Sequence, residues 1–142
     1  MWISPKGEGI DHNRMIEVTC AIIVENNRVL ATRRSAGMPH ALKWEFPGGK
    51  VKEGESPDYC IKREIEEELG IKVGVDRILP SVIHHYENHS VKLIPFVCSI
   101  LEGTISLSEH QEYRWIPCGE LDELDWLEAD VEVIRIVKAS LS

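Results

Sequence analysis

The segment Gly49–Ile71, GKVKEGESPDYCIKREIEEELGI, contains the clearest helix signals of the 142-residue chain. Ser56 is a candidate N-cap, Pro57 suits the first helical position, and Gly70 suits a C-terminal stop. Between these ends, apolar residues recur every four positions and predict one buried stripe, formed by Ile61, Ile65 and Leu69. The segment is therefore predicted to form an amphipathic helix that follows a loop.

Three glutamates share one face of this helix. With Glu64 as the origin of a helical wheel of about 100° per residue, Glu67 lies near ~300° and Glu68 near ~40°. Lys62 and Glu66 point away, toward solvent. Like charges at this spacing repel each other, and no lysine or arginine is expected at the spacing that would neutralise this face. A divalent cation would neutralise it, although a glutamate-rich face alone is more often plain solvated surface.

A longer pattern surrounds the glutamates. Gly49 is followed after five residues by Glu55, and after seven more by the run Arg63–Ile71, REIEEELGI. This is the complete Nudix box, GX5EX7REUXEEXGU with U aliphatic, so the chain resembles the Nudix hydrolase superfamily. Seven fixed residue types, each of roughly 7% frequency, coincide by chance on the order of 10⁻⁸ per window.

The resemblance implies an α/β (α+β) Nudix fold, in which a mixed β-sheet is sandwiched between helices. It also implies a set of metal ligands: Glu64, Glu67, Glu68 and the backbone of Gly48, where the missing Cβ permits a close approach. Arg63 and Glu55 match positions that orient the ligand carboxylates. The expected cofactor is Mg²⁺, with Mn²⁺ as a possible substitute.

Outside the box, the chain resembles the MutT-like branch of the superfamily. LATRR at Leu30–Arg34, WEFPGGK at Trp44–Lys50 and WLEAD at Trp126–Asp130 are typical of that branch. The resemblance implies a nucleoside triphosphate substrate, which is split into a nucleoside monophosphate and pyrophosphate. In the implied mechanism water attacks the β-phosphorus, and Glu64 or Glu109 removes its proton.

The same resemblance implies substrate contacts. Arg34 would contact a phosphate, although it could also be an ordinary surface arginine at a strand end. Glu109, on a loop from Ser106 to Glu112 that is expected to be mobile, would bind metal or act as the base. Three further residues would surround the nucleobase. Phe46 and Leu93 would form walls of its pocket, and Asn88, in a turn, would lie at the pocket edge.

Asp130 is the position that bears most on base identity. The MutT enzyme that acts on 8-oxo-guanine nucleotides has an amide there, whereas an ionised carboxylate can only accept hydrogen bonds. The Ala129-Asp130 pair resembles branch members that act on (d)CTP, which favours cytosine or modified cytosine nucleotides. A buried Asp130 can also be protonated, which restores a donor and keeps 8-oxo-dGTP open. Alternatively, Asp130 is an ordinary residue of a helix N-terminus.

Composition narrows the possible partners. The formal net charge of −8 argues against polymeric nucleic acid and membranes, because both attract cationic surfaces. The sequence has no signal-like start and no long apolar run, so secretion and membrane insertion are not expected. The four cysteines lack metal-type spacing, and we expect reduced thiols in a cytoplasmic protein. Residues 1–14 are predicted to be a loose leader and residues 15–142 a single domain, as a monomer or homodimer.

Strands are predicted over Met15–Val24, Val29–Arg33 and Val91–Leu101, and the first two are expected to form a hairpin. Pro95 suggests a bulge or an edge position within its strand. A last helix is predicted over Ala129–Leu141, with an apolar face formed by Val131, Ile134, Val137 and Leu141.

Three other functions fit parts of the sequence. The first is hydrolysis of another nucleoside diphosphate linked to a group X, such as a nucleotide sugar or a dinucleotide. The second is a Nudix module that binds nucleotides without catalysis, although degenerate modules usually lose the glutamates. The third is an unrelated protein with an acidic surface helix, which the complete pattern argues against.

Replacement of Glu67 by Gln tests the metal assignment. We expect kcat to fall by roughly two orders of magnitude or more, because metal-assisted hydrolysis depends on the carboxylate ligands. The protein should remain folded, as checked by circular dichroism. Near-normal turnover by this variant would contradict the assignment.

Overall fold

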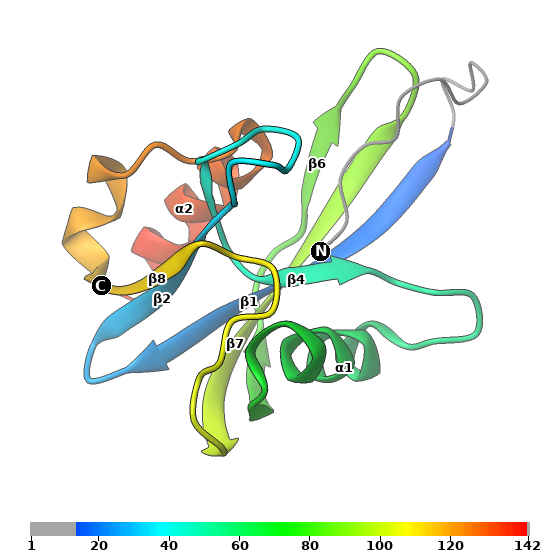
Figure 1. Ribbon diagram of the computed structural model, residues 1–142. Helices are drawn as coiled ribbons and strands as arrows, with labels where there is room; N and C mark the ends of the chain where they lie inside the picture. Colours follow the sequence, from blue (N-terminus) through cyan, green and yellow to red (C-terminus); the bar gives the residue numbers. More distant parts are fainter. Residues whose placement is uncertain (1–13, 142) are drawn as a thin grey trace.

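Runs of β-branched and apolar residues form the strands at the centre of the fold. The computed structural model of the protein describes residues 14–141 (Figure 1). The strands are β1 (Met15–Glu25), β2 (Arg28–Arg33), β3 (Trp44–Glu45), β4 (Gly48–Lys50), β5 (Lys72–Ile78), β6 (Val82–His85), β7 (Ser90–Glu102) and β8 (Glu112–Pro117). The helices are α1 (Pro57–Leu69), the short 3-10 helix η1 (Cys118–Glu123) and α2 (Glu128–Leu141).

The predicted N-terminal leader, residues 1–14, lies outside the described residues except for Arg14. The carbonyl of Arg14 accepts a hydrogen bond from the Ser90 backbone N–H at 2.9 Å. Within residues 14–141, no helix has both the length and the apolar character needed to cross a membrane.

The strands form a mixed sheet with the order β3-β2-β1-β7-β5, while β4 pairs with β1, β6 with β7 and β8 with β2. β1 and β7 run parallel along nine residue pairs, and the other pairs are antiparallel. The predicted hairpin of β1 and β2 is confirmed. Its turn residues Asn26 and Asn27 have φ of 52° and 62°, the left-handed conformation that asparagine tolerates in tight hairpin turns.

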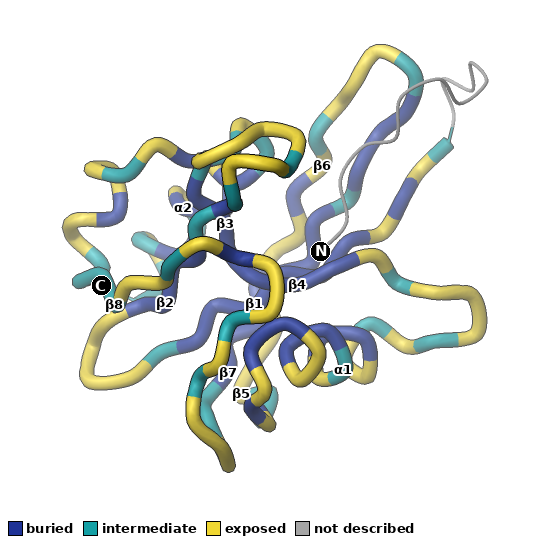
Figure 2. The backbone as a smooth tube through the Cα atoms, viewed as in Figure 1, coloured by how far each residue is buried: buried dark blue, intermediate teal, exposed yellow. Residues whose placement is uncertain are grey.

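Two hydrophobic cores lie on opposite faces of the sheet (Figures 1 and 2). α1 buries its predicted stripe on one face, where Ile61, Ile65 and Leu69 are fully buried. α2 and η1 cover the other face, together with Trp44 and Trp126. The predicted mixed sheet between helices is confirmed. Cys20 and Cys98 are buried in these cores, Cys60 is also buried, and all four cysteines are free thiols.

Both predicted ends of α1 are confirmed. The Ser56 side chain accepts a hydrogen bond from the Tyr59 backbone N–H at 3.4 Å, and Pro57 is the first helical residue. Gly70 ends the helix at φ 69°, and its N–H donates to the Glu66 carbonyl at 3.0 Å.

The edge position proposed for Pro95 is wrong, because β7 is an interior strand. β7 has β1 on one side, and on the other side it has β6 up to Leu93 and β5 from Phe96 onward. The Pro95 carbonyl accepts from the Leu79 N–H at 2.9 Å, so its nitrogen points to the same side, into the gap between β6 and β5. A proline is tolerated there because no strand requires an N–H at that point.

The predicted apolar face of α2 needs one correction. Val131 is half exposed, whereas Val133, Ile134 and Val137 are buried against the sheet. Asp130 is also buried and lies on the same side as these residues. A polar residue on the packed face shifted the apparent stripe, since the sequence pattern counts only apolar positions.

A matched pair of substitutions on α2 tests this orientation. Val133→Ala removes two buried methyl groups and should lower the free energy of unfolding by about 2 kcal/mol. Val131→Ala, on the exposed side, should change it by less than about 0.5 kcal/mol. Urea unfolding of both variants provides the measurement, and equal losses would contradict the orientation.

Candidate active site

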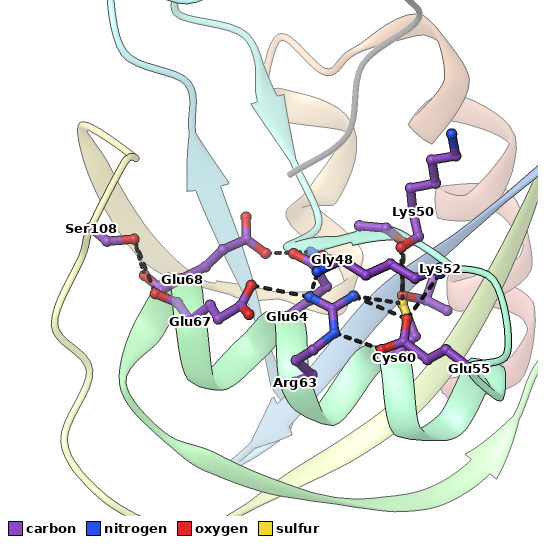
Figure 3. A network of polar contacts seen from close by, with 12 residues as sticks. Gly48, Lys50, Lys52, Glu55, Cys60, Arg63, Glu64, Glu67, Glu68 and Ser108 are labelled. Atoms are coloured by element: carbon purple, nitrogen blue, oxygen red, sulfur yellow. Dashed lines mark hydrogen bonds and ion pairs between the residues drawn. The ribbon is translucent and has the colours of Figure 1, made fainter.

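β4 lies directly against α1, and the contact places two glutamates beside a glycine backbone (Figure 3). The Gly48 N–H donates to Glu68 Oε2 at 3.1 Å. A Cβ added to Gly49 would lie 2.3 Å from Cδ of Glu64, and one added to Gly48 would lie 2.1 Å from the Thr19 carbonyl oxygen. Neither position has room for a side chain, so both glycines are required by space. β3 ends at Glu45, and Gly48 and Gly49 are the first residues of β4.

Arg63 lies at the centre of the carboxylates (Figure 3). Its Nε is 2.6 Å from Glu55 Oε2, and its Nη1 is 3.0 Å from Glu64 and 3.1 Å from Glu67. The expectation that no arginine could neutralise this face is therefore wrong, because Arg63 is four residues before Glu67. Hydrogen bonds from Arg63 lower the pKa of Glu55 to about 2. Glu55 thus holds Arg63 in place.

Glu68 has the most perturbed carboxyl group of the helix. Burial raises its pKa to about 8, and repulsion from Glu45, Glu64 and Glu109 adds to the effect. Glu67, in contrast, has a side chain that is 57% exposed. Within residues 14–141 no three acidic, histidine or cysteine side chains converge closely enough to enclose an ion. The donor set nevertheless fits an oxygen-preferring divalent cation, which would relieve the repulsion around Glu68.

Two residues behind β4 fix its backbone, and sequence reasoning did not identify them. Thr19 Oγ1 donates to the Gly49 carbonyl at 3.1 Å. Cys60 Sγ lies 3.4 Å from the Lys50 carbonyl and 3.4 Å from Thr19 Oγ1. Burial raises the pKa of the Cys60 thiol to about 11, so it remains a hydrogen-bonding thiol.

The loop of residues 103–111, between β7 and β8, passes over the end of α1. Ser108 Oγ donates to the Glu67 and Glu68 carbonyls at 3.2 and 3.3 Å (Figure 3). The Ser108 N–H also donates to the Glu68 carbonyl at 3.2 Å. These bonds satisfy carbonyls that a helix end leaves without partners. They bring Glu109, which is exposed, close enough to raise the pKa of Glu68. The predicted mobility of this loop stays a prediction.

A cavity of about 280 Å³ adjoins Gly48, between β1, β7 and the start of α2. Three of the residues predicted to contact the substrate line it, namely Phe46, Leu93 and Asp130. Asn88 and Arg34 are not among the residues that line it. The cavity is also lined by residues that sequence reasoning did not single out: Cys20, Lys43, Glu45, Tyr86, Trp126 and Glu128.

Asp130 is buried at the wall of the cavity that is also lined by Phe46 and Trp126, whose rings are tilted against each other with centroids 4.7 Å apart. Burial raises the pKa of Asp130 well above its ordinary value, and repulsion from Glu45 acts in the same direction. A hydrogen bond from the Phe46 backbone and the charge of Arg34 only partly oppose this shift. This shift favours the protonated form of Asp130, which can donate a hydrogen bond as well as accept one.

Arg34 is fully buried. Its Nη1 lies 3.2 Å from Glu45 Oε1, and its Nε donates to the Pro39 carbonyl at 2.8 Å. The alternative reading of Arg34 as an ordinary surface arginine is therefore wrong, and the phosphate contact stays a prediction. Glu45 was missed because one glutamate in a short strand has no periodic signal. WEFPGGK was the segment that could have indicated it.

Comparison with known proteins identifies the family. Residues 13–135 match the sequence profile of the NUDIX domain. The chain belongs to the Nudix family. It is an enzyme that hydrolyses phosphoric anhydride bonds. This Nudix chain is 32% identical over 126 residues to the CTP pyrophosphohydrolase of Escherichia coli K12, covering 89% of this chain and 93% of the relative. It is also 32% identical over 114 residues to the 8-oxo-dGTP diphosphatase of the same organism, covering 80% and 88%.

Solved structures agree with this assignment. The solution structure of the Escherichia coli ORF135 protein matches with a TM-score of 0.79 at 31% identity, covering 89% of this chain and 91% of that chain. The crystal structure of the MutT protein from Methanosarcina mazei Go1 matches with a TM-score of 0.79 at 27% identity, covering 89% and 95%. The MutT-like resemblance is confirmed.

Gly49→Ala tests the contact between β4 and α1. The added methyl group would overlap the Glu64 carboxylate, so kcat should fall roughly 100-fold through displacement of a catalytic group. Gly37→Ala is the matched control, because nothing lies within 4 Å of a Cβ added there. Equal activity of the Gly49→Ala and Gly37→Ala variants would refute the argument that the backbone approaches Glu64 closely.

The Glu67→Gln variant also has a matched control. This control is Glu66→Gln, on the solvent side of the same helix.

Proposed function

We propose that this Nudix hydrolase is a Mg²⁺-dependent nucleoside triphosphate pyrophosphohydrolase that favours (d)CTP or modified cytosine nucleotides. It would convert the triphosphate and water into a nucleoside monophosphate and pyrophosphate. The observation that carries this proposal is the position of the cavity. Its apolar and hydrogen-bonding walls meet the carboxylate site at Gly48. A nucleotide with its base in the cavity would therefore have its phosphates beside α1.

The metal site would consist of Glu64, Glu67, Glu68 and the Gly48 carbonyl, with Glu109 as a further ligand or as the base. When bound, Mg²⁺ would screen the acidic site from the phosphates and polarise the bridging oxygens. Glu67 is more than half exposed and held by one contact to Arg63, so its carboxylate is free to turn toward an ion. Glu64 is held by Arg63 and by the fit against Gly49, which keeps it in place.

Proton removal from the attacking water is assigned to Glu64 or Glu109. Glu64 is buried and fixed, while Glu109 is exposed on the loop of residues 103–111. Both stand close to Glu68, as its raised pKa indicates. Arg63 contributes indirectly, because it orients Glu64 and is itself held by Glu55.

The base preference rests on Asp130. In its protonated form the carboxyl has one donor and one acceptor, which is the hydrogen-bonding capacity of an amide. This pair complements the adjacent N3 acceptor and N4 donor of cytosine. The name of the CTP pyrophosphohydrolase relative, which aligns over 89% of this chain, supports the same preference.

An 8-oxo-dGTP diphosphatase is the second candidate. The protonated state of Asp130 favours it as well, because the carboxyl then resembles the amide that the 8-oxo-guanine enzyme has at this position. Several relatives bear that name. The cavity volume of about 280 Å³ is near the lower end of ligand pockets, which suits a single nucleobase better than a second nucleoside.

A nucleotide panel with Mg²⁺ tests these proposals. The panel contains dCTP, 5-methyl-dCTP, CTP, 8-oxo-dGTP, dGTP and ADP-ribose, and kcat/KM is measured for each with detection of pyrophosphate. We expect the highest value for a cytosine nucleotide. Turnover without pyrophosphate would indicate a different diphosphate substrate, and no turnover of any compound would indicate a binding module.

Two variants of Asp130 belong to the same experiment. Asp130→Asn keeps a donor and an acceptor, so it should retain kcat/KM for the preferred base within about threefold. Asp130→Leu removes both and should lose roughly 10- to 100-fold, the effect of a lost hydrogen bond to substrate. Equal losses in the two variants would contradict recognition by a protonated carboxyl.

A further inference from the structure

His110 is the one buried residue of the loop of residues 103–111. Its side chain is 0% exposed, whereas Glu109 immediately before it and Gln111 immediately after it are exposed. An imidazole placed inside an otherwise solvated loop acts as an anchor, because the loop cannot move far without withdrawing it from the core. The anchor is one residue away from the glutamate assigned to metal binding or proton removal.

The imidazole is bound to a cavity residue. His110 Nε2 forms a hydrogen bond of 2.8 Å with Glu45 Oε2, in which an imidazole N–H donates to the carboxylate oxygen. Glu45 also accepts hydrogen bonds from Arg34 Nη1, at 3.2 Å to Oε1 and 3.3 Å to Oε2, and it lines the cavity. The same carboxylate therefore forms part of the cavity wall and fixes the loop.

The second ring nitrogen of His110 is buried at a cost in free energy. Nδ1 of His110 is buried and has no hydrogen-bond partner within the described part of the chain. An apolar side chain would fill the position without this penalty. The bond from Nε2 to Glu45 is thus the polar contact that requires a histidine here.

Other bonds confine the loop on both sides of Glu109. Toward α1, the Ser106 N–H donates to the Leu69 carbonyl at 2.8 Å, and Ser108 binds the Glu68 carbonyl. Toward β2, Ser35 Oγ donates to the Glu109 carbonyl. The Gln111 N–H donates to the Arg33 carbonyl at 2.8 Å. Among the contacts that hold this loop within residues 14–141, only the bond from His110 to Glu45 described above reaches a residue that lines the cavity.

We propose that His110 is a positioning residue that couples the nucleobase cavity to Glu109 through Glu45. A ligand that orders Glu45 in the cavity also orders the imidazole and the loop, and Glu109 then stands over the carboxylates of α1. This inference rests on the proposed function for the role of Glu109. The contacts that connect the residues do not depend on the identity of the nucleotide.

Three variants of His110 separate positioning from simple packing. His110→Gln places an amide N–H close to the position of Nε2, His110→Asn places it close to Nδ1, and His110→Ala has neither. With the best nucleotide of the panel, kcat should fall about 10- to 100-fold in the Asn and Ala variants and recover most of its value in the Gln variant. KM should change less than about threefold, because Arg34 still holds Glu45.

A double-mutant cycle tests the path through Glu109. If His110 acts by positioning Glu109, adding His110→Ala to Glu109→Gln should lower kcat by less than about twofold beyond the single Glu109 variant. Independent losses that multiply would overturn the proposal. So would equal activity of the Gln and Asn variants, or wild-type turnover by Glu109→Gln.

Backbone hydrogen exchange tests the anchor without activity. Amides of residues 105–110 should exchange at least about tenfold faster in His110→Ala and His110→Asn than in the wild type and in His110→Gln. Unchanged exchange in all variants would overturn the proposal. This measurement remains valid if the protein hydrolyses none of the nucleotides, so failure of the proposed function is distinguishable from failure of the anchor.

Discussion

The close packing of β4 against α1 is the constraint on which the site depends. At Gly49 the backbone leaves no space for a Cβ beside the Glu64 carboxylate, and the Gly48 N–H binds Glu68. This packing holds two acidic groups together at a partly buried place, where their mutual repulsion is strong. The protein compensates for this with Arg63 and, on our proposal, with divalent cations.

A carboxyl group with a raised pKa lies at each end of the site, and the main cause of the shift is the same in both. Burial is the largest contribution to the raised pKa of both Glu68 and Asp130, and Glu45 adds repulsion to each. At Glu68 a cation would restore the ionised form. At Asp130 the charge of Arg34 opposes the shift only in part, so the protonated form is favoured and, on our proposal, offers a donor to a base. On our proposal, one fold thus supports an ionic metal site beside a neutral site for the base.

Local features of the site were predictable because they depend on short spacings. The Nudix box identified the family, the helix α1 with both its caps, and the three glutamates on one face, since helical geometry relates residues three and four apart. The same reasoning missed the ion pair of Arg63 with Glu67, although its spacing was visible. It also placed Val131 inside, because an apolar pattern does not reveal that Asp130 is buried.

The sequence by itself determined the family, the bond that is cleaved and the helix that carries the carboxylates, because these follow from one contiguous segment. Only the tertiary structure decided that Arg34 is buried on Glu45, that burial raises the pKa of Asp130, and that His110 connects the loop to the cavity. These properties arise between strands and loops far apart in the chain. Burial and charge at such contacts depend on the packed fold, which no local pattern contains.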